Sequence, residues 1–75
     1  MSNILLTALA KKLEGDVAIA KANIQVYQNQ SVGIGEHPEI VQAIEMEIGK
    51  MAEAQDKLDT VNQLLNIEDK EFIVE

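Results

Sequence analysis

The sequence predicts an all-α fold: an antiparallel helical hairpin of two long helices, which pairs with a second copy to form a four-helix bundle. Three observations predict it. Apolar residues make up 47% of the 75 residues but aromatic residues only 3%, a profile typical of long helices. Proline and two of the four glycines gather in residues 33–38. Apolar residues recur every three or four positions on both sides of that segment.

The first helix is expected over residues 3–31. Gly15 is its weak point, because a glycine inside a helix costs about 1 kcal/mol relative to alanine. Asp16 follows directly and could cap a new helix, so a kink or break at Gly15 is the alternative to one continuous helix. The apolar stripe of this segment consists of Leu6, Leu9, Leu13, Val17, Ala20, Ile24 and Tyr27.

A turn is expected over residues 32–37. Its glycines permit the positive φ that often follows a helix end, and Pro38 suits the first position of the next helix. The start of that helix could accept an anion, but Glu36 and Glu39 already place negative charge there. His37, the only histidine, is expected to cap the helix or to face solvent. No metal site is assigned.

The second helix is expected over residues 38–65, where the apolar pattern keeps a heptad spacing over more than three heptads. Gln55 and Asn62 interrupt it. They are candidates for specifying the register and the oligomeric state, or else half-solvated positions at the edge of the seam. The stripe consists of Val41, Ile44, Ile48, Met51, Gln55, Leu58, Asn62 and Leu65.

Residues 66–75 are expected to form a C-terminal tail. This segment is acidic and then ends in a short β-prone run that contains Phe72. An ordered contact inside an oligomer is the favoured interpretation. The alternatives are a docking peptide that binds another protein and a frayed terminus.

The two stripes also predict how the helices pair. In an antiparallel hairpin, the residue numbers of facing positions have a nearly constant sum. Matched in order, from Leu6 with Leu65 to Tyr27 with Ile44, the stripes give sums of 71 or 72. Neither helix alone requires that agreement, so it supports a hairpin with both helices in register.

Apolar residues also extend around each helix beyond this seam. A surface helix normally has one apolar side, and exposed apolar area of this extent usually marks an interface. Two hairpins packed as a homodimeric four-helix bundle would cover it, and a higher homo-oligomer or another protein partner would also do so. The interface candidates are Leu5, Ala8, Ile19, Ala22, Val26, Ile40, Ala43, Ala54, Val61 and Phe72.

The charge disfavours several classes of partner. The net charge is −7, the six basic residues are all lysine, and almost all of the negative charge follows residue 35. Direct nucleic-acid binding and binding to anionic membranes are therefore disfavoured. A nucleic-acid mimic would concentrate carboxylates in this way, but an ordinary solvated helix face does so as well. No membrane span or signal peptide is apparent, and a cytoplasmic location is expected.

The sequence offers no set of residues for catalysis. It has no cysteine, so disulfides and thiolate metal sites are excluded. No nucleophile–base pair or metal cluster is evident. We therefore assign no catalytic, cofactor-binding or metal-binding residue and expect a protein that is not an enzyme.

The segment Val32-Gly33-Ile34-Gly35-Glu36-His37-Pro38 resembles the turn of small, uncharacterised α-helical proteins of tailed bacteriophages, including cyanophages. These proteins similarly carry this turn before an acidic helix, and residues 52–58 match a second landmark. The resemblance covers residues 17–64. It implies a viral source and action in a bacterial cytoplasm or a virion, and it assigns a role to no residue.

Two functions follow as hypotheses. The favoured one is a non-enzymatic assembly or protein-interaction module that acts through its helical surface, and the resemblance implies a host or phage protein as its partner. The alternative is an oligomer that binds or sequesters a small anion such as a nucleotide, with Lys11, Lys12 and Lys21 as the cations that would contact it.

Overall fold

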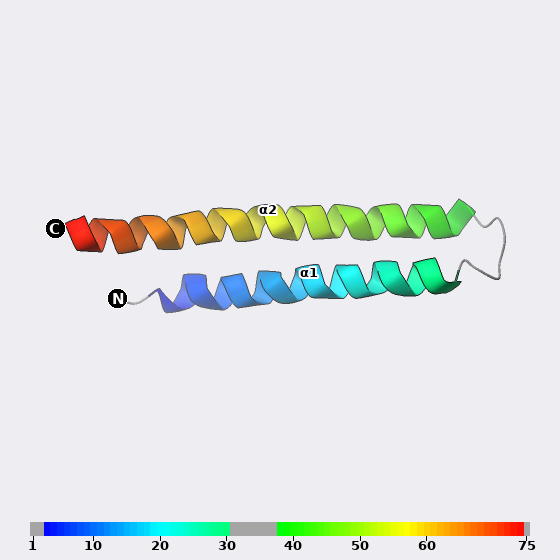
Figure 1. Ribbon diagram of the computed structural model, residues 1–75, viewed down its shortest axis with the longest axis horizontal. Coiled ribbons are helices and arrows are strands. Elements are labelled where there is room, and N and C mark those ends of the chain that lie inside the picture. Colours follow the sequence, from blue (N-terminus) through cyan, green and yellow to red (C-terminus); the bar gives the residue numbers. More distant parts are fainter. Residues whose placement is uncertain (1–2, 31–37, 75) are drawn as a thin grey trace.

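The protein is a hairpin of two antiparallel helices, α1 (Ile4–Gln30) and α2 (Pro38–Val74), which lie side by side over the length of α1 (Figure 1). The computed structural model describes the backbone of residues 3–30 and 38–74 and the side chains of residues 3–29 and 39–67. The molecule measures 61 × 14 × 13 Å between its outermost Cα atoms. The predicted all-α helical hairpin is confirmed, and the four-helix bundle stays a prediction.

Helix α1 begins after Asn3, whose carbonyl oxygen accepts a hydrogen bond from the Thr7 amide at 2.8 Å. This bond closes the first turn of the helix. The helix then runs without interruption through Gly15 to Gln30, so the alternative of a break at Gly15 is wrong. Leu13 and Val17, on either side of the glycine, both pack in the core and hold the helix together there.

Helix α2 is longer than the sequence pattern predicts: it continues to Val74, whereas the predicted helix ended at Leu65. Most of the predicted C-terminal tail is therefore helical. The residues from 66 to 74 contain no glycine and no proline, so nothing in the segment breaks the helix. The predicted turn at 32–37, with His37, and the side chain of Phe72 lie outside the described residues.

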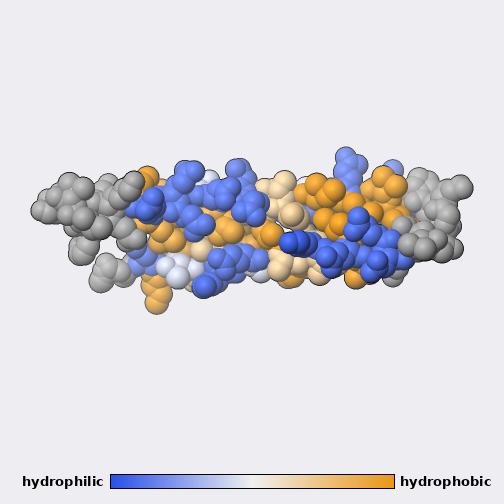
Figure 2. Space-filling view, viewed as in Figure 1, coloured by the Kyte–Doolittle hydropathy of each residue, from blue (hydrophilic) through white to orange (hydrophobic). Residues whose placement is uncertain are grey.

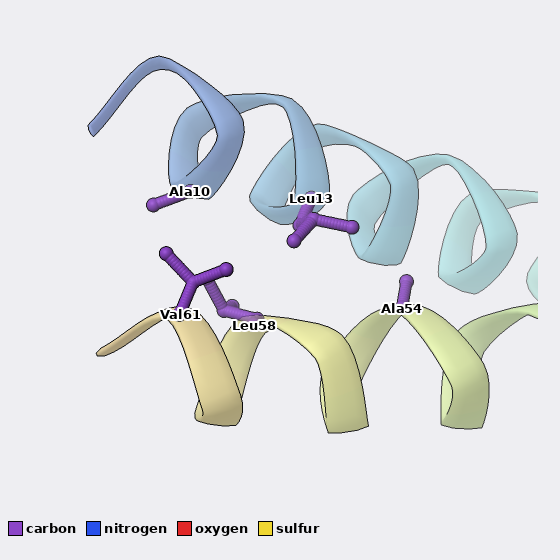
Figure 3. Packing of buried hydrophobic residues seen from close by; sticks show 5 residues of the cluster. All are labelled: Ala10, Leu13, Ala54, Leu58 and Val61. Atoms are coloured by element: carbon purple, nitrogen blue, oxygen red, sulfur yellow. The ribbon is translucent and has the colours of Figure 1, made fainter. Parts of the chain in front are cut away.

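The core is a thin layer between the two helices. The buried hydrophobic residues are Ala10, Leu13, Ala20, Ala54, Leu58 and Val61, and Leu6, Val17 and Leu65 pack against them. In Figure 3, Ala10 of α1 lies opposite Val61 of α2, and Leu13 points toward Leu58 and Ala54. The numbers of Ala10 and Val61, and those of Leu13 and Leu58, sum to 71, as the predicted register requires.

The predicted seam needs one correction, because α2 is rotated relative to the expectation. Leu9 on α1 is exposed where Ala10 is buried, and the two polar residues of the predicted α2 seam are exposed. The observed α2 seam contains one polar residue, Glu47, whereas the predicted seam contained two. The predicted seam residues that the structure exposes are Leu9, Val41, Ile48, Gln55 and Asn62.

Replacement of Gly15 and Gly49 tests whether the helices are regular and continuous at these two residues. A Cβ atom added to Gly15 or Gly49 meets no other atom within 4 Å, and both residues lie inside continuous helices. Because alanine loses less backbone entropy on folding, we expect Gly15→Ala and Gly49→Ala each to stabilise the chain by about 0.5–1 kcal/mol. Urea unfolding followed by circular dichroism measures this. Destabilisation by Gly15→Ala would contradict a regular helix at that residue.

Candidate functional site

A polar cluster crosses the seam near the middle of the hairpin. Glu47 of α2 is the one charged or polar side chain that is buried among the described residues, with 7% of its surface exposed. The Asn23 amide of α1 donates a hydrogen bond to Glu47 Oε1 at 3.2 Å, and Lys50 Nζ lies 3.3 Å from Glu47 Oε2. Both carboxylate oxygens therefore have a partner, and one of these bonds joins the two helices.

The hydrogen bond from Asn23 lowers the pKa of Glu47 from its ordinary value of 4.5. Burial acts in the opposite direction, while the hydrogen bond and the positive charge of Lys50 add to the lowering. The folded chain thus favours the ionised carboxylate.

This shift predicts a pH dependence. A carboxylate with a lowered folded pKa stabilises the protein above its unfolded pKa, and that contribution disappears as the pH falls through the folded value. We expect the difference in thermal midpoint between the wild type and Glu47→Gln to be largest at neutral pH. It should shrink when the pH falls below 4.5. Thermal melts at neutral and acidic pH measure it, and a difference that grows in acid would contradict the assignment.

The cluster lies in a groove between the helices with a volume of about 300 Å³. The groove occupies one of the two broad faces of the hairpin. Its charged lining consists of three lysines and three carboxylates and is therefore neutral, in a chain with a net charge of −7. The lining residues are Lys12, Leu13, Asp16, Ile19, Ala20, Asn23, Glu47, Lys50, Glu53, Ala54 and Lys57.

Each lysine of the groove is paired with a carboxylate on its own helix. The Lys12–Asp16 distance is 2.7 Å, the Lys50–Glu47 distance is 3.3 Å, and Lys57 lies 3.2 Å from Glu53. Of the three lysines that the anion-binding hypothesis requires, Lys12 lines the groove and Lys11 and Lys21 do not. An anion would have to compete with the carboxylates already in place.

The groove is the middle part of a longer surface, which consists of one row of residues on each helix. On α1, its polar residues belong to a row with spacings of three and four, and such a row stays on one side of a helix. The row consists of Leu5, Leu9, Lys12, Asp16, Ile19, Asn23 and Val26. The equivalent row on α2 consists of Met46, Lys50, Glu53, Lys57, Thr60, Leu64 and Ile67. We call these two rows together the groove face.

Most of the exposed apolar surface lies on the groove face. Ten large hydrophobic residues are exposed among those described, and the groove face contains seven of them. Four of these seven residues lie near the N-terminal end of α1, and the other three lie toward its C-terminal end. The seven are Leu5, Leu9, Ile19, Val26, Met46, Leu64 and Ile67. Figure 2 shows the opposite broad face, which is largely hydrophilic over the C-terminal part of α2 and has hydrophobic residues over the N-terminal part of that helix.

The structure divides the predicted interface residues into groups. Leu5, Ile19 and Val26 are exposed on the groove face. The remaining described candidates lie elsewhere: Ala8 and Ala22 are exposed off the groove face, and Ile40 and Ala43 are half-buried. Ala54 and Val61 are buried in the hairpin core, so their prediction as outward-facing residues is wrong. They fill the seam because α2 is rotated relative to the expectation.

Gln55 and Asn62 lie outside the observed seam. Both are exposed, and Gln55 donates a hydrogen bond to Asp59 on the same helix at 3.2 Å. The polar residues that join the helices are Asn23 and Glu47, which the sequence pattern missed. A signal was present, because Glu47 alone interrupts the apolar stripe Ile40, Ile44, Glu47, Met51, Ala54, Leu58, Val61 and Leu65, which also has heptad spacing.

Comparison with protein-family models, with curated proteins and with solved structures finds no match for this chain. Among the described residues, no helix is long and apolar enough to cross a membrane, and no group of three or more acidic or histidine side chains could hold a metal ion.

Proposed function

We propose that the chain is a non-enzymatic assembly module that acts through its helical surface, first by associating with itself. We further propose a phage as its source and a host or phage protein as the partner of the assembled form. The source rests on the resemblance of the segment from Val32 to Pro38. The assembly rests on the surface of the hairpin.

The observation that carries the proposal is the large surface of the chain relative to its mass. The accessible surface is 5764 Å² for a mass of 8.3 kDa. A compact monomer of this mass exposes about 4,600 Å², so the hairpin has an excess of about 1,200 Å². No large side chain among the described residues has less than 2% of its surface exposed. Association would cover the excess and supply the burial that one hairpin lacks.

A concentration series tests self-association. When folding is coupled to association, the thermal midpoint rises with protein concentration. We expect a rising midpoint for this chain, measured by circular dichroism over a hundredfold range of concentration. A midpoint independent of concentration would overturn the proposal that the chain assembles with itself.

The anion-binding alternative predicts a different response. The paired lysines of the groove argue against it, because each already has a carboxylate within 3.3 Å. We expect nucleotides to leave the thermal midpoint unchanged at fixed protein concentration. A midpoint that rises with nucleotide concentration would favour the alternative, since a ligand that binds the folded state stabilises it.

A further inference from the structure

We infer that the groove face is the surface on which a second copy of this chain docks, and that its polar centre aligns the two copies. This inference rests on the proposed self-association and adds which surface is used. It rests on the arrangement of apolar and polar residues on that face and on the charge balance of the groove.

The arrangement of the face makes it complementary to itself. Apolar residues lie at both ends, with Leu9 and Leu64 at one end and Val26 and Met46 at the other. Charged residues lie between them. When two such faces meet with their long axes aligned, apolar ends cover apolar ends and the polar centres coincide. This holds whether the two copies have the same or opposite directions, so a two-fold symmetric dimer satisfies both surfaces.

The charge balance favours a second copy over a strongly charged partner. Two chains of net charge −7 repel one another in general. The groove avoids this repulsion because its three lysines and three carboxylates cancel. A basic or an acidic partner protein would gain no attraction from a neutral groove.

The polar centre has a function of its own in such a dimer. A copy displaced along the groove would place apolar side chains from the ends of the face, such as Leu9 and Val26, against the charged residues of its centre. Because an unpaired charge inside an interface is costly, displaced alignments are disfavoured. The centre therefore specifies the alignment, as a polar position does in a coiled coil.

Two matched variants test the inference. Ile19 lies on the groove face and is 61% exposed, while Ile48 lies outside both rows of that face and is 52% exposed. Lysine at either position adds the same charge at an exposed site, so the fold should tolerate both changes. We expect Ile19→Lys to weaken dimerisation at least about tenfold and Ile48→Lys to change it little, as measured by sedimentation equilibrium of the full chain.

Circular dichroism of each variant shows whether the helices are retained. If Ile19→Lys lowers the helix content, Val26→Lys on the same face decides instead. A dimer that survives both groove-face changes, or that Ile48→Lys dissociates, would overturn the inference and leave self-association intact. A wild-type chain that is monomeric at every concentration would overturn the inference together with the proposed function.

Discussion

Leu58→Ala is expected to destabilise the hairpin by about 2–5 kcal/mol, because it removes a large buried side chain and leaves a cavity. Leu58 lies in the centre of the core cluster between Ala54 and Val61. The hairpin has only six buried hydrophobic residues among those described, and three of them are alanines. A domain of 75 residues has a total stability of about 4–11 kcal/mol. One truncation therefore removes much of the free energy of unfolding, which urea denaturation at fixed protein concentration measures.

A pair of valines on α2 provides the control and tests the rotation of that helix. Val61 is buried, whereas Val41 is 67% exposed. We expect Val61→Ala to cost about 1.5–3 kcal/mol, since each buried methyl group contributes about 0.8 kcal/mol and the cavity adds to this. Val41→Ala should stay within about 0.5 kcal/mol of the wild type. If Val41→Ala destabilised the chain more than Val61→Ala, the result would support the predicted seam with Val41 and Asn62 inside and contradict the observed seam.

Ala20→Leu is expected to destabilise the hairpin by about 1–3 kcal/mol, because it inserts a large side chain where the helices approach each other. Ala20 is the most buried of the core residues, with 2% of its surface exposed. Small residues at such positions allow two helices to pack closely. Leucine would force the helices apart and weaken neighbouring contacts such as those of Leu13.

Ala18→Leu is the matched control for this overpacking. Ala18 is exposed on the same helix, two residues away, and has space for a larger side chain. We expect a change within about 0.5 kcal/mol, because leucine and alanine are both good helix formers. If both leucines had equal effects in urea unfolding, the close approach of the helices at Ala20 would be contradicted.

The fold class and the register were predictable from the sequence for physical reasons. The clustered breakers at 33–38 separate two segments with helical periodicity, and residue sums near 71 align them. The rotation of α2 was not predictable in the same way. The stripe with Gln55 and the stripe with Ala54 both keep heptad spacing and share Leu58, so periodicity alone does not separate them. Counting polar residues along each stripe would have favoured the observed one.

The Asn23–Glu47 cluster was not predicted, because neither residue is apolar and an apolar pattern therefore contains neither of them. A buried carboxylate is tolerated there only because an amide from the other helix and a lysine one turn away satisfy it. That arrangement depends on the relative rotation of two helices, which the pattern of one helix does not contain. The apolar ends of the groove face were only partly predicted, through Leu5, Ile19 and Val26.

The molar mass of the wild-type chain in solution tests the central claim most directly, namely that a second copy covers the exposed apolar surface of the hairpin. Sedimentation equilibrium over the micromolar range measures it without labels or variants. We expect the mass to approach twice the 8.3 kDa of one chain as the concentration rises. A fully helical chain with a mass of 8.3 kDa at every concentration would contradict the account.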